Sequence, residues 1–308
     1  MSKSSTNLAR TIIAGLALTF AVSACGDDDP LQVQSNDLVS TAASAGSFGT
    51  LLTAVDAAGL TSTLATGGPF TVFAPTDAAF DALPAGTLDA LLADTDALAE
   101  VLLYHVAQGE ITAAQLDGAS SVTTLQGQKI AVTSGSVVLN GVVVDEADIM
   151  ADNGIIHVIG QVLLPPSFDL PTTAAETSGF STLAAALEAT GLDAALGGEG
   201  PFTVFAPTDA AFGALPDGTL DALLADPAAL SEILLYHVVE GEVFSRDLDG
   251  VISTETLAGF PVLFDLSDGA RINDANIVAT NVLATNGVIH VIDKVLLPPT
   301  KDILETAI

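Results

Sequence analysis

The stretch GPFTVFAPTDAAF occupies residues 68–80 and occurs again, unchanged, at residues 200–212. Three further segments recur in the same order: GTLDALLAD at 86–94 and 218–226, LLYHV at 102–106 and 234–238, and NGIIHVI at 153–159 with NGVIHVI at 286–292. The period of about 130 residues is far above the 20–50 residues of solenoid units. The sequence therefore predicts two copies of one autonomous domain.

The repeated stretch has the pattern of a strand that leads into a helix. Residues 70–75 are rich in β-branched and aromatic types, with alternating polarity, which favours a buried strand. Thr76 then stands where a helix N-cap is expected, and Asp77 would complement the dipole in the first turn. Thr208 and Asp209 repeat the pair in the second copy. None of these residues forms a nucleophile or metal motif, so we interpret them as structural.

The N-terminal residues have the composition of an export signal. Residues 1–24 combine a basic start, an apolar run too short for a membrane span, and small residues. The sequence Val22-Ser23-Ala24-Cys25 resembles a bacterial lipobox, so Cys25 is expected to carry a lipid anchor. Cys25 is the only cysteine, which excludes an intrachain disulfide. We expect a cell-envelope lipoprotein, on the outer membrane, facing the periplasm or exposed at the surface.

The acidic composition limits the partners of the chain. The sequence has 38 acidic and 7 basic residues, a net charge of −31, and loss of Lys3 and Arg10 with the signal would leave −33. Nucleic-acid binding requires the opposite sign. The same charge argues against docking on anionic lipid through a basic face, so membrane contact is expected only through the N-terminal lipid.

Each copy has helical spacing first and strand spacing later. A helix is expected over 96–106, with Thr87 and Thr219 as caps of shorter helices. Period-two segments that follow predict strands at 128–133, 136–145 and 153–164, and at 260–266, 270–280 and 286–297. Helices followed by strands in each copy indicate an α+β fold.

These patterns divide the chain into five parts. The expected order is a signal peptide (1–24), a lipidated cysteine and acidic stalk (25–36), a first domain (37–166), a short linker (167–171) and a second domain (172–308). The stalk is polar and without apolar periodicity. Its Asp27–Asp29 run could hold Ca²⁺, but a simple tether fits a run without a ligand loop better.

With these motifs in view, the chain resembles the fasciclin domain family. TVFAPTDAAF is similar to the first hallmark box of the family, LLYHV to its central Tyr-His motif, and NGIIHVIGQVLLPP to its second box. The resemblance implies two tandem domains, each a seven-stranded antiparallel β-wedge with flanking helices. It also implies a secreted or surface-anchored protein that acts in adhesion or matrix interaction. The first copy has Gly160 where the second has Asp293.

The four histidines are the imidazoles available for a site. His157 and His290 lie in expected strands and are interpreted as buried groups bonded to the backbone, with Asn153 and Asn286 as turn residues. No metal motif contains any of them, and no cofactor is expected. The remaining residues form the Tyr-His motifs: Tyr104-His105 and Tyr236-His237. Packing and capping would suit these pairs, while the family resemblance implicates them in partner binding, and both roles stay open.

No motif of catalysis is present, so the chain is not expected to be an enzyme. The main hypothesis is an adhesion module that binds surface or matrix proteins, glycans or its own copies, with avidity from the tandem domains. The alternative is a carrier of a small apolar ligand, which an exposed apolar patch between Leu88–Leu92 and Leu98–Leu103 would favour. A structural envelope protein without a specific ligand is a third possibility.

Overall fold

The computed structural model describes residues 36–133, 135–267 and 269–299. The predicted signal peptide, Cys25 and nearly all of the stalk lie outside the described residues. Both repeats belong to one compact unit. No helix in the described part of the chain combines the length and the apolar composition that a membrane span needs.

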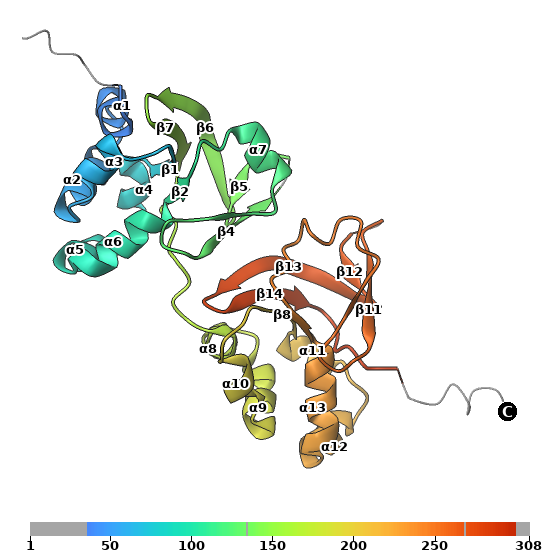
Figure 1. Ribbon diagram of the computed structural model, residues 1–308. Helices are drawn as coiled ribbons and strands as arrows, with labels where there is room; N and C mark the ends of the chain where they lie inside the picture. Colours follow the sequence, from blue (N-terminus) through green and yellow to red (C-terminus); the bar gives the residue numbers. More distant parts are fainter. Residues whose placement is uncertain (1–35, 134, 268, 300–308) are drawn as a thin grey trace, which may run out of the picture. The chain divides into compact units, whose positions relative to one another are not determined.

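The first copy, which we call domain 1, starts with helices and ends with strands (Figure 1). Its elements are α1 (Leu38–Ala45), α2 (Gly49–Ala57), α3 (Thr61–Thr66), β1 (Phe70–Pro75), α4 (Asp77–Asp81), α5 (Thr87–Ala93), α6 (Thr95–Tyr104), β2 (Val106–Gln108), α7 (Ala113–Gly118), β3 (Ser121–Thr123), β4 (Lys129–Thr133), β5 (Val138–Leu139), β6 (Val142–Ala151) and β7 (Gly154–Ile159).

The second copy, domain 2, repeats this order without a counterpart of α7. Its elements are α8 (Leu170–Glu176), α9 (Ser181–Thr190), α10 (Leu192–Leu196), β8 (Phe202–Pro207), α11 (Asp209–Gly213), α12 (Thr219–Ala225), α13 (Pro227–Tyr236), β9 (Val238–Glu240), β10 (Ser253–Glu255), β11 (Pro261–Asp265), β12 (Arg271–Ile272), β13 (Ala275–Ala284) and β14 (Gly287–Ile292).

Each domain has a seven-stranded sheet, as the family resemblance implied; the sheet is mostly antiparallel, as expected, but contains one parallel pair and is therefore mixed. The strand orders are β2-β1-β7-β6-β5-β4-β3 and β10-β11-β12-β13-β14-β8-β9. β1 runs parallel to β7, and β8 runs parallel to β14, while every other named pair is antiparallel. The prediction missed this because the parallel partners are separated by some 80 residues of helices and strands, which form the long connection that parallel pairing requires.

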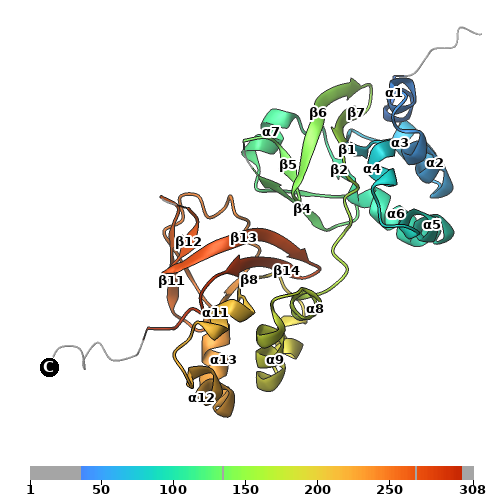
Figure 2. The same cartoon turned by 180° about the vertical axis from the view of Figure 1, so that it is seen from behind.

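β1 separates two apolar cores in domain 1. Phe70, Val72 and Ala74 face a core shared with the helices, and Phe73 faces a second core shared with β4 and β5. Figures 1 and 2 show helices α1 to α6 gathered beside β1. Domain 2 repeats this division around β8. The period-two pattern of the hallmark stretch therefore reflects a strand that is buried on both faces.

Several local predictions differ from the structure. The short elements β2, β3 and α7 were not predicted, and α6 ends at Tyr104 instead of residue 106. Gly86, in the left-handed conformation (φ 86°), holds the N-cap position of α5, so Thr87 is the first helical residue and not the cap. The segment expected as one strand, 136–145, is a hairpin that turns at Asn140-Gly141.

The boundary of domain 2 also lies earlier than expected. Asp169 caps α8 by accepting a hydrogen bond from the backbone N–H of Thr172. Leu170, the first residue of α8, is 2% exposed and packs in the core of domain 2. Part of the segment assigned to the linker, 167–171, is therefore the first turn of the domain.

Candidate functional site

The tyrosine of each Tyr-His motif is a buried brace between a helix and a hairpin. Tyr104 ends α6, and its hydroxyl donates to the carbonyl of Lys129 at 2.9 Å while it accepts from Asn140 Nδ2 at 2.8 Å. Asn140 also accepts, through Oδ1, from the N–H of Ala131 at 2.8 Å. Burial raises the pKa of Tyr104 to about 12, so the hydroxyl stays protonated and able to donate. The pair thus fixes the position of β4.

Domain 2 contains the same brace on β11. The hydroxyl of Tyr236 donates to the carbonyl of Pro261 at 3.0 Å and accepts from Asn273 Nδ2 at 3.0 Å. Asn273 Oδ1 accepts from the N–H of Leu263 at 2.9 Å. Both asparagines adopt positive φ, 50° and 51°, a conformation that asparagine tolerates better than most residues.

We predict that Tyr104→Phe lowers the free energy of unfolding of domain 1 by about 1–2 kcal/mol, because it leaves buried polar partners without the hydroxyl. Faster amide exchange at Ala131 and Lys129 should accompany the loss, since β4 loses its brace. Tyr236→Phe is the matched control and should affect only β11. Unchanged exchange in β4 would contradict a bracing role.

The histidine of each motif connects the last helical turn to the segment after the final strand. His105 Nδ1 donates to the carbonyl of Val101 at 2.7 Å, and Nε2 accepts from the N–H of Leu163 at 2.9 Å. His237 makes the same pair of contacts with Ile233 and Leu296. Burial lowers the pKa of both rings to about 4. Both imidazoles are therefore neutral near pH 7 and serve as donor and acceptor at once.

The strand histidines are also buried and bonded to the backbone. His157 Nε2 donates to the carbonyl of Ile111 at 2.8 Å, and its ring stacks on Phe73 with 5.8 Å between centres. His290 donates to the carbonyl of Val243 at 2.8 Å, while its Nδ1 is buried without a partner. Burial lowers the pKa of both rings. Each ring holds the loop that follows β2 or β9 against the sheet.

Thr76 and Asp77 act on two different helices. The hydroxyl of Thr76 accepts from the N–H of Ala79 at 3.3 Å and caps α4. Asp77 instead accepts from the N–H groups of Thr50, at 2.7 Å, and Gly49, at 3.3 Å, at the start of α2. The hydrogen bonds from Thr50 lower the pKa of Asp77. Both residues thus satisfy N–H groups that helix termini leave free.

Domain 2 repeats these two caps. Thr208 accepts from the N–H of Ala211 at 3.2 Å, and Asp209 accepts from the N–H of Thr182 at 2.7 Å. Asp209 also accepts from the hydroxyl of Ser181 at 2.8 Å. Hydrogen bonds from Thr182 lower the pKa of Asp209.

Asn153 connects three separate segments through its amide. Oδ1 accepts from the N–H of Leu38 at 2.9 Å, and Nδ2 donates to the carbonyls of Leu64 and Gly67, both at 2.8 Å. The following Gly154 pairs so closely with Phe70 that a Cβ would collide with the carbonyl oxygen of Phe70. The Asn-Gly pair thus does more than turn the chain: it fixes α1 and α3 to the sheet.

Asn286 has the same role in domain 2. It accepts from the N–H of Leu170 at 2.9 Å and donates to the carbonyls of Leu196, at 2.7 Å, and Gly198, at 2.9 Å.

The burial of the Tyr-His motifs bears on the expectation of partner contact. Tyr104, His105, Tyr236 and His237 are between 0% and 2% exposed. A partner cannot touch these side chains in this conformation, because each lies beneath the strands and helices that it connects. Their influence on a surface would pass through β4 and β11, the strands that Tyr104 and Tyr236 fix.

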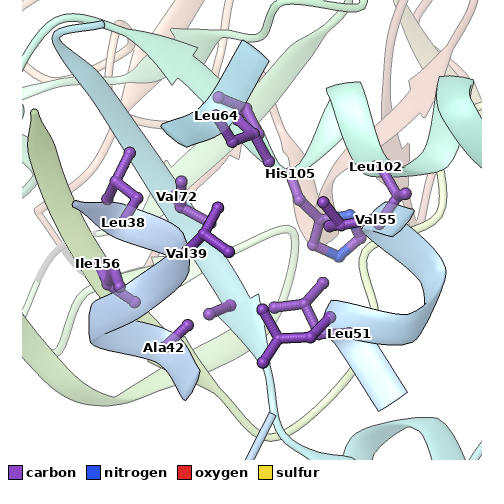
Figure 3. A pocket seen from close by; sticks show the side chains of 13 residues that line it. Leu38, Val39, Ala42, Leu51, Val55, Leu64, Val72, Leu102, His105 and Ile156 are labelled. Atoms are coloured by element: carbon purple, nitrogen blue, oxygen red, sulfur yellow. The ribbon is translucent and has the colours of Figure 1, made fainter. Parts of the chain in front are cut away.

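Domain 1 contains a small apolar cavity between α1, α2, α3 and β1 (Figure 3). Its volume is about 40 Å³, against about 10 Å³ at the equivalent place in domain 2. Val55 lines the cavity where domain 2 has the longer Leu187. Of the residues Leu88–Leu92 and Leu98–Leu103, where an exposed apolar patch would favour the carrier role, only Leu102 lines this cavity.

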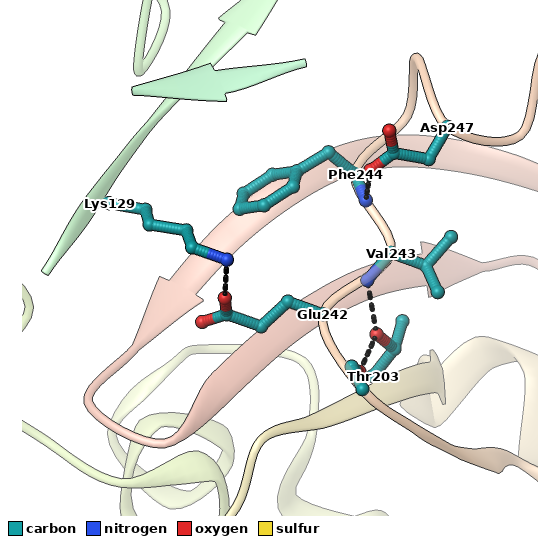
Figure 4. A network of polar contacts seen from close by, with 7 residues as sticks. Lys129, Thr203, Glu242, Val243, Phe244 and Asp247 are labelled. Carbon is teal, nitrogen blue, oxygen red and sulfur yellow. Dashed lines mark hydrogen bonds and ion pairs between the residues drawn. The ribbon is translucent and has the colours of Figure 1, made fainter. Parts of the chain in front are cut away.

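The two domains contact each other through β4 and the segment after β9 (Figure 4). Lys129 Nζ lies 2.6 Å from Glu242 Oε2 and 5.8 Å from the centre of the Phe244 ring. Ala131 and Phe244, from different domains, are buried together with Val288. Within domain 2, the N–H of Phe244 donates to Asp247 at 2.9 Å and fixes the segment.

A second cation also bridges the domains. Arg246 Nη1 donates to the carbonyl of Ala119 at 3.1 Å. The described residues contain four lysines and arginines, and two of them, Lys129 and Arg246, lie at this contact. The sequence reasoning missed Lys129, Phe244 and Arg246. The one signal in the sequence was that Lys and Arg are rare in this acidic chain, which makes each of them a candidate for a specific contact.

The described residues contain no cluster suited to metal binding: within 36–133, 135–267 and 269–299, no three His, Cys, Asp or Glu side chains gather in a group able to hold an ion. The motif histidines are instead occupied by backbone groups, so they serve the fold.

Comparisons with known proteins identify one family for both repeats. The fasciclin domain model matches residues 46–165 and 178–298. The transforming growth factor-beta-induced protein ig-h3 of Sus scrofa is 34% identical over 248 residues, which cover 78% of this chain and 36% of that protein. The cell surface glycolipoprotein MPB83 of Mycobacterium bovis is 38% identical over 136 residues, which cover 42% of this chain and 60% of that protein.

A solved structure of a FAS1 domain pair from the insect cell adhesion molecule fasciclin I is also similar, with 19% identity and a TM-score of 0.39, over 83% of this chain and 97% of that one. This chain spans about a third of the length of the ig-h3 protein. The family model covers most of this chain, in two blocks that coincide with the repeated domains. The chain therefore belongs to the fasciclin domain family and contains two tandem copies of its domain.

Proposed function

We propose that this chain is an exported, lipid-anchored protein of the cell envelope that mediates adhesion through surface or matrix proteins, glycans or its own copies. The observation that carries the proposal is the pair of fasciclin domains in one chain. Two linked binding modules gain avidity when both engage. The relative MPB83 is a cell surface glycolipoprotein, which agrees with the resemblance to a lipobox at Cys25.

The buried histidines and the high negative charge both bear on the proposed interaction role. The histidines of the motifs are buried and bonded to the backbone, so they are not available for proton transfer to a substrate. The high negative charge keeps separate copies soluble unless salt screens them. Adhesion is therefore expected to depend on ionic strength.

A binding assay tests the proposal directly. Beads coated with the full chain would be incubated with collagen, fibronectin, envelope polysaccharide and surfaces that carry the chain itself. We expect retention on at least one of these surfaces above that of beads coated with an unrelated acidic protein of similar charge. Retention equal to that control on every surface would argue against adhesion.

The lipid anchor has its own test. Cys25→Ala should move the chain from the membrane fraction to the soluble fraction, because it removes the thiol that would be acylated. Ser23→Ala, which keeps the cysteine, is the matched control and should leave the chain in the membrane. A Cys25→Ala chain that stays in the membrane fraction would point to an uncleaved anchor.

The carrier alternative rests on the cavity of domain 1. Ligand pockets for small molecules usually enclose about 300–1,000 Å³, far above the 40 Å³ observed here. Native mass spectrometry is expected to show the protein mass alone. A bound mass that the wild type retains and Val55→Leu loses would favour the carrier role instead.

A further inference from the structure

The contact between the domains covers one face of the sheet in domain 1. Ala131, on β4, is 1% exposed because Phe244 of domain 2 packs against it. Arg246 reaches the carbonyl of Ala119, just before β3, on the same side. We call the outward side of β3 and β4 the acceptor face of domain 1. The segment of domain 2 that contains Phe244 and Arg246 is the inserting segment.

Because the domain is duplicated, domain 2 has an acceptor face of its own, on β10 and β11. Leu263 stands at the position of Ala131 and is 55% exposed. Val251, the counterpart of Ala119, is 39% exposed, and the adjacent Ile252 is 78% exposed. Pro261 replaces Lys129. The second acceptor face is thus open to solvent. Its exposed apolar groups lie beside the exposed carboxylate of Glu255, which pairs with Pro261.

Domain 1 likewise has a counterpart of the inserting segment. Thr112 stands at the position of Phe244, and Ala114 at that of Arg246. On β6, the counterpart of Leu283 is Met150, which is 61% exposed. Leu283 itself packs against the buried contact between the domains. Domain 1 therefore has the small Thr112 where domain 2 has the large Phe244. Its Met150 is exposed, whereas the equivalent Leu283 packs at the contact.

The contact within the chain and the proposed contact between chains place large and small residues on opposite sides. Within the chain, the large Phe244 packs on the small Ala131. Between chains, the small Thr112 would meet the large Leu263. Domain 2 of one copy and domain 1 of the next would then pack as closely as the two domains within one chain. Lys129 and Glu242 have no equivalent ion pair there, because Pro261 carries no charge. Glu110, the counterpart of Glu242, and Glu255 would lie at the contact without a cation, so the contact would be weaker than the one within the chain and would depend on salt to screen these charges.

We propose that the chain associates with its own copies head to tail, with the acceptor face of domain 2 on the inserting segment of domain 1 of the next copy. The inference rests on the proposed function and names a second copy as the partner. A contact that repeats in one direction is heterologous and produces open chains instead of closed dimers. Such an assembly would connect anchored molecules in a row.

The buried brace of domain 2 gives the Tyr-His motif a part in this contact. Tyr236 fixes the carbonyl of Pro261, and its partner Asn273 fixes the N–H of Leu263. Both strand residues lie on the proposed acceptor face. Tyr236 is thus a positioning residue for the contact, which it supports from beneath the surface.

Sedimentation velocity of the full chain carrying Cys25→Ala tests the proposal, over NaCl concentrations from about 0.05 to 1 M to screen the charge. We expect a mass that rises with protein concentration, without a plateau at the dimer, and more steeply at high salt. Leu263→Lys should lower the association constant about tenfold or more, since it replaces the large apolar side chain that packs against Thr112 with a charged one that must lose water. Val278→Lys, at another exposed position, should not.

A mixing experiment identifies the partner surface. Thr112→Asp keeps a residue that caps helices well and should weaken association when present alone. An equimolar mixture of the Leu263→Lys and Thr112→Asp chains should recover association, because the new ammonium and carboxylate groups meet across the contact. Circular dichroism would check that each variant is folded.

Two results would overturn the inference. A mass that stays monomeric at every salt concentration excludes the contact. Association that Leu263→Lys weakens, but that the mixture does not restore, would place another surface against the acceptor face. A monomeric chain that still binds matrix surfaces would leave the adhesion function intact, whereas a chain that associates but adheres to no surface or cell would argue against that function alone.

Discussion

Acidification from neutral pH to about 4 should destabilise both domains, by about 3 kcal/mol each, through His105 and His237. Burial lowers the pKa of each ring from 6.5 to about 4 in the folded chain. Between these values the unfolded chain binds more protons than the folded one. Stability is therefore full above pH 6.5 and is lost progressively as the pH falls toward 4.

The loss has a structural reason. Protonation of Nε2 in His105 would turn the acceptor of the Leu163 N–H into a donor, so two donors would face each other in a buried place. The measurement is urea unfolding at a series of pH values, followed through methyl NMR signals of each domain. His157 and His290, whose pKa values burial also lowers, act in the same direction.

A control distinguishes the effect of the motif histidines on acid stability from the effect of protonating the acidic residues. Replacing both residues, as His105→Gln with His237→Gln, should flatten the stability profile between pH 6.5 and 4. Direct NMR titration of the wild-type rings gives a second readout that does not depend on the folding of the variant. A ring that titrates near its usual pKa of 6.5 would contradict the account.

Asn153→Ala should lower the free energy of unfolding of domain 1 by about 3 kcal/mol. The amide makes three short hydrogen bonds to backbone groups of Leu38, Leu64 and Gly67, and each group left unpaired costs about 1 kcal/mol or more. Because these groups belong to α1 and the end of α3, both helices should show faster amide exchange. Urea unfolding and hydrogen exchange provide the two readouts.

Matched variants exist within the chain. Asn286→Ala should have the same effect on domain 2 and leave domain 1 unchanged, since its partners lie in α8 and around α10. Asn36→Ala, at an exposed position, should change stability little. A loss for Asn153→Ala no larger than that for Asn36→Ala would show that the amide is not structural.

The features predicted correctly from sequence are those that depend on local chemistry. The alternation in residues 70–75 predicted β1, and the duplication predicted two domains of the same fold. The segment 136–145 was correctly predicted to be extended, but the turn at Asn140-Gly141 divides it into the two strands of a hairpin. Local patterns thus located the elements well and their limits less well.

The features that sequence could not predict depend on contacts between distant residues. The parallel pairing of β1 with β7 joins residues about 80 positions apart, and no local pattern records it. Asp77 satisfies the start of α2, 27 residues earlier, although its position suggested a role in its own helix. The strands β2 and β3, of three residues each, are too short to show a period.

The Tyr-His motif shows the same limit for the candidate site. Sequence left open whether Tyr104 and His105 contact a partner or support the fold. Their burial depends on β4, β5 and the segment that contains Leu163, none of which lies near them in the chain. The contact surface was missed because Lys129 and Arg246 become neighbours of their partners only after both domains have folded.

Retention of cells under flow tests the adhesion role most directly. Cells that display the full chain, and otherwise identical cells that lack it, would be passed over surfaces coated with the full chain and over the matrix surface selected by the bead assay. We predict that more of the displaying cells are retained, and that Cys25→Ala cells, which release the protein, behave like cells without it. Equal retention of displaying and non-displaying cells on all these surfaces would contradict the adhesion function.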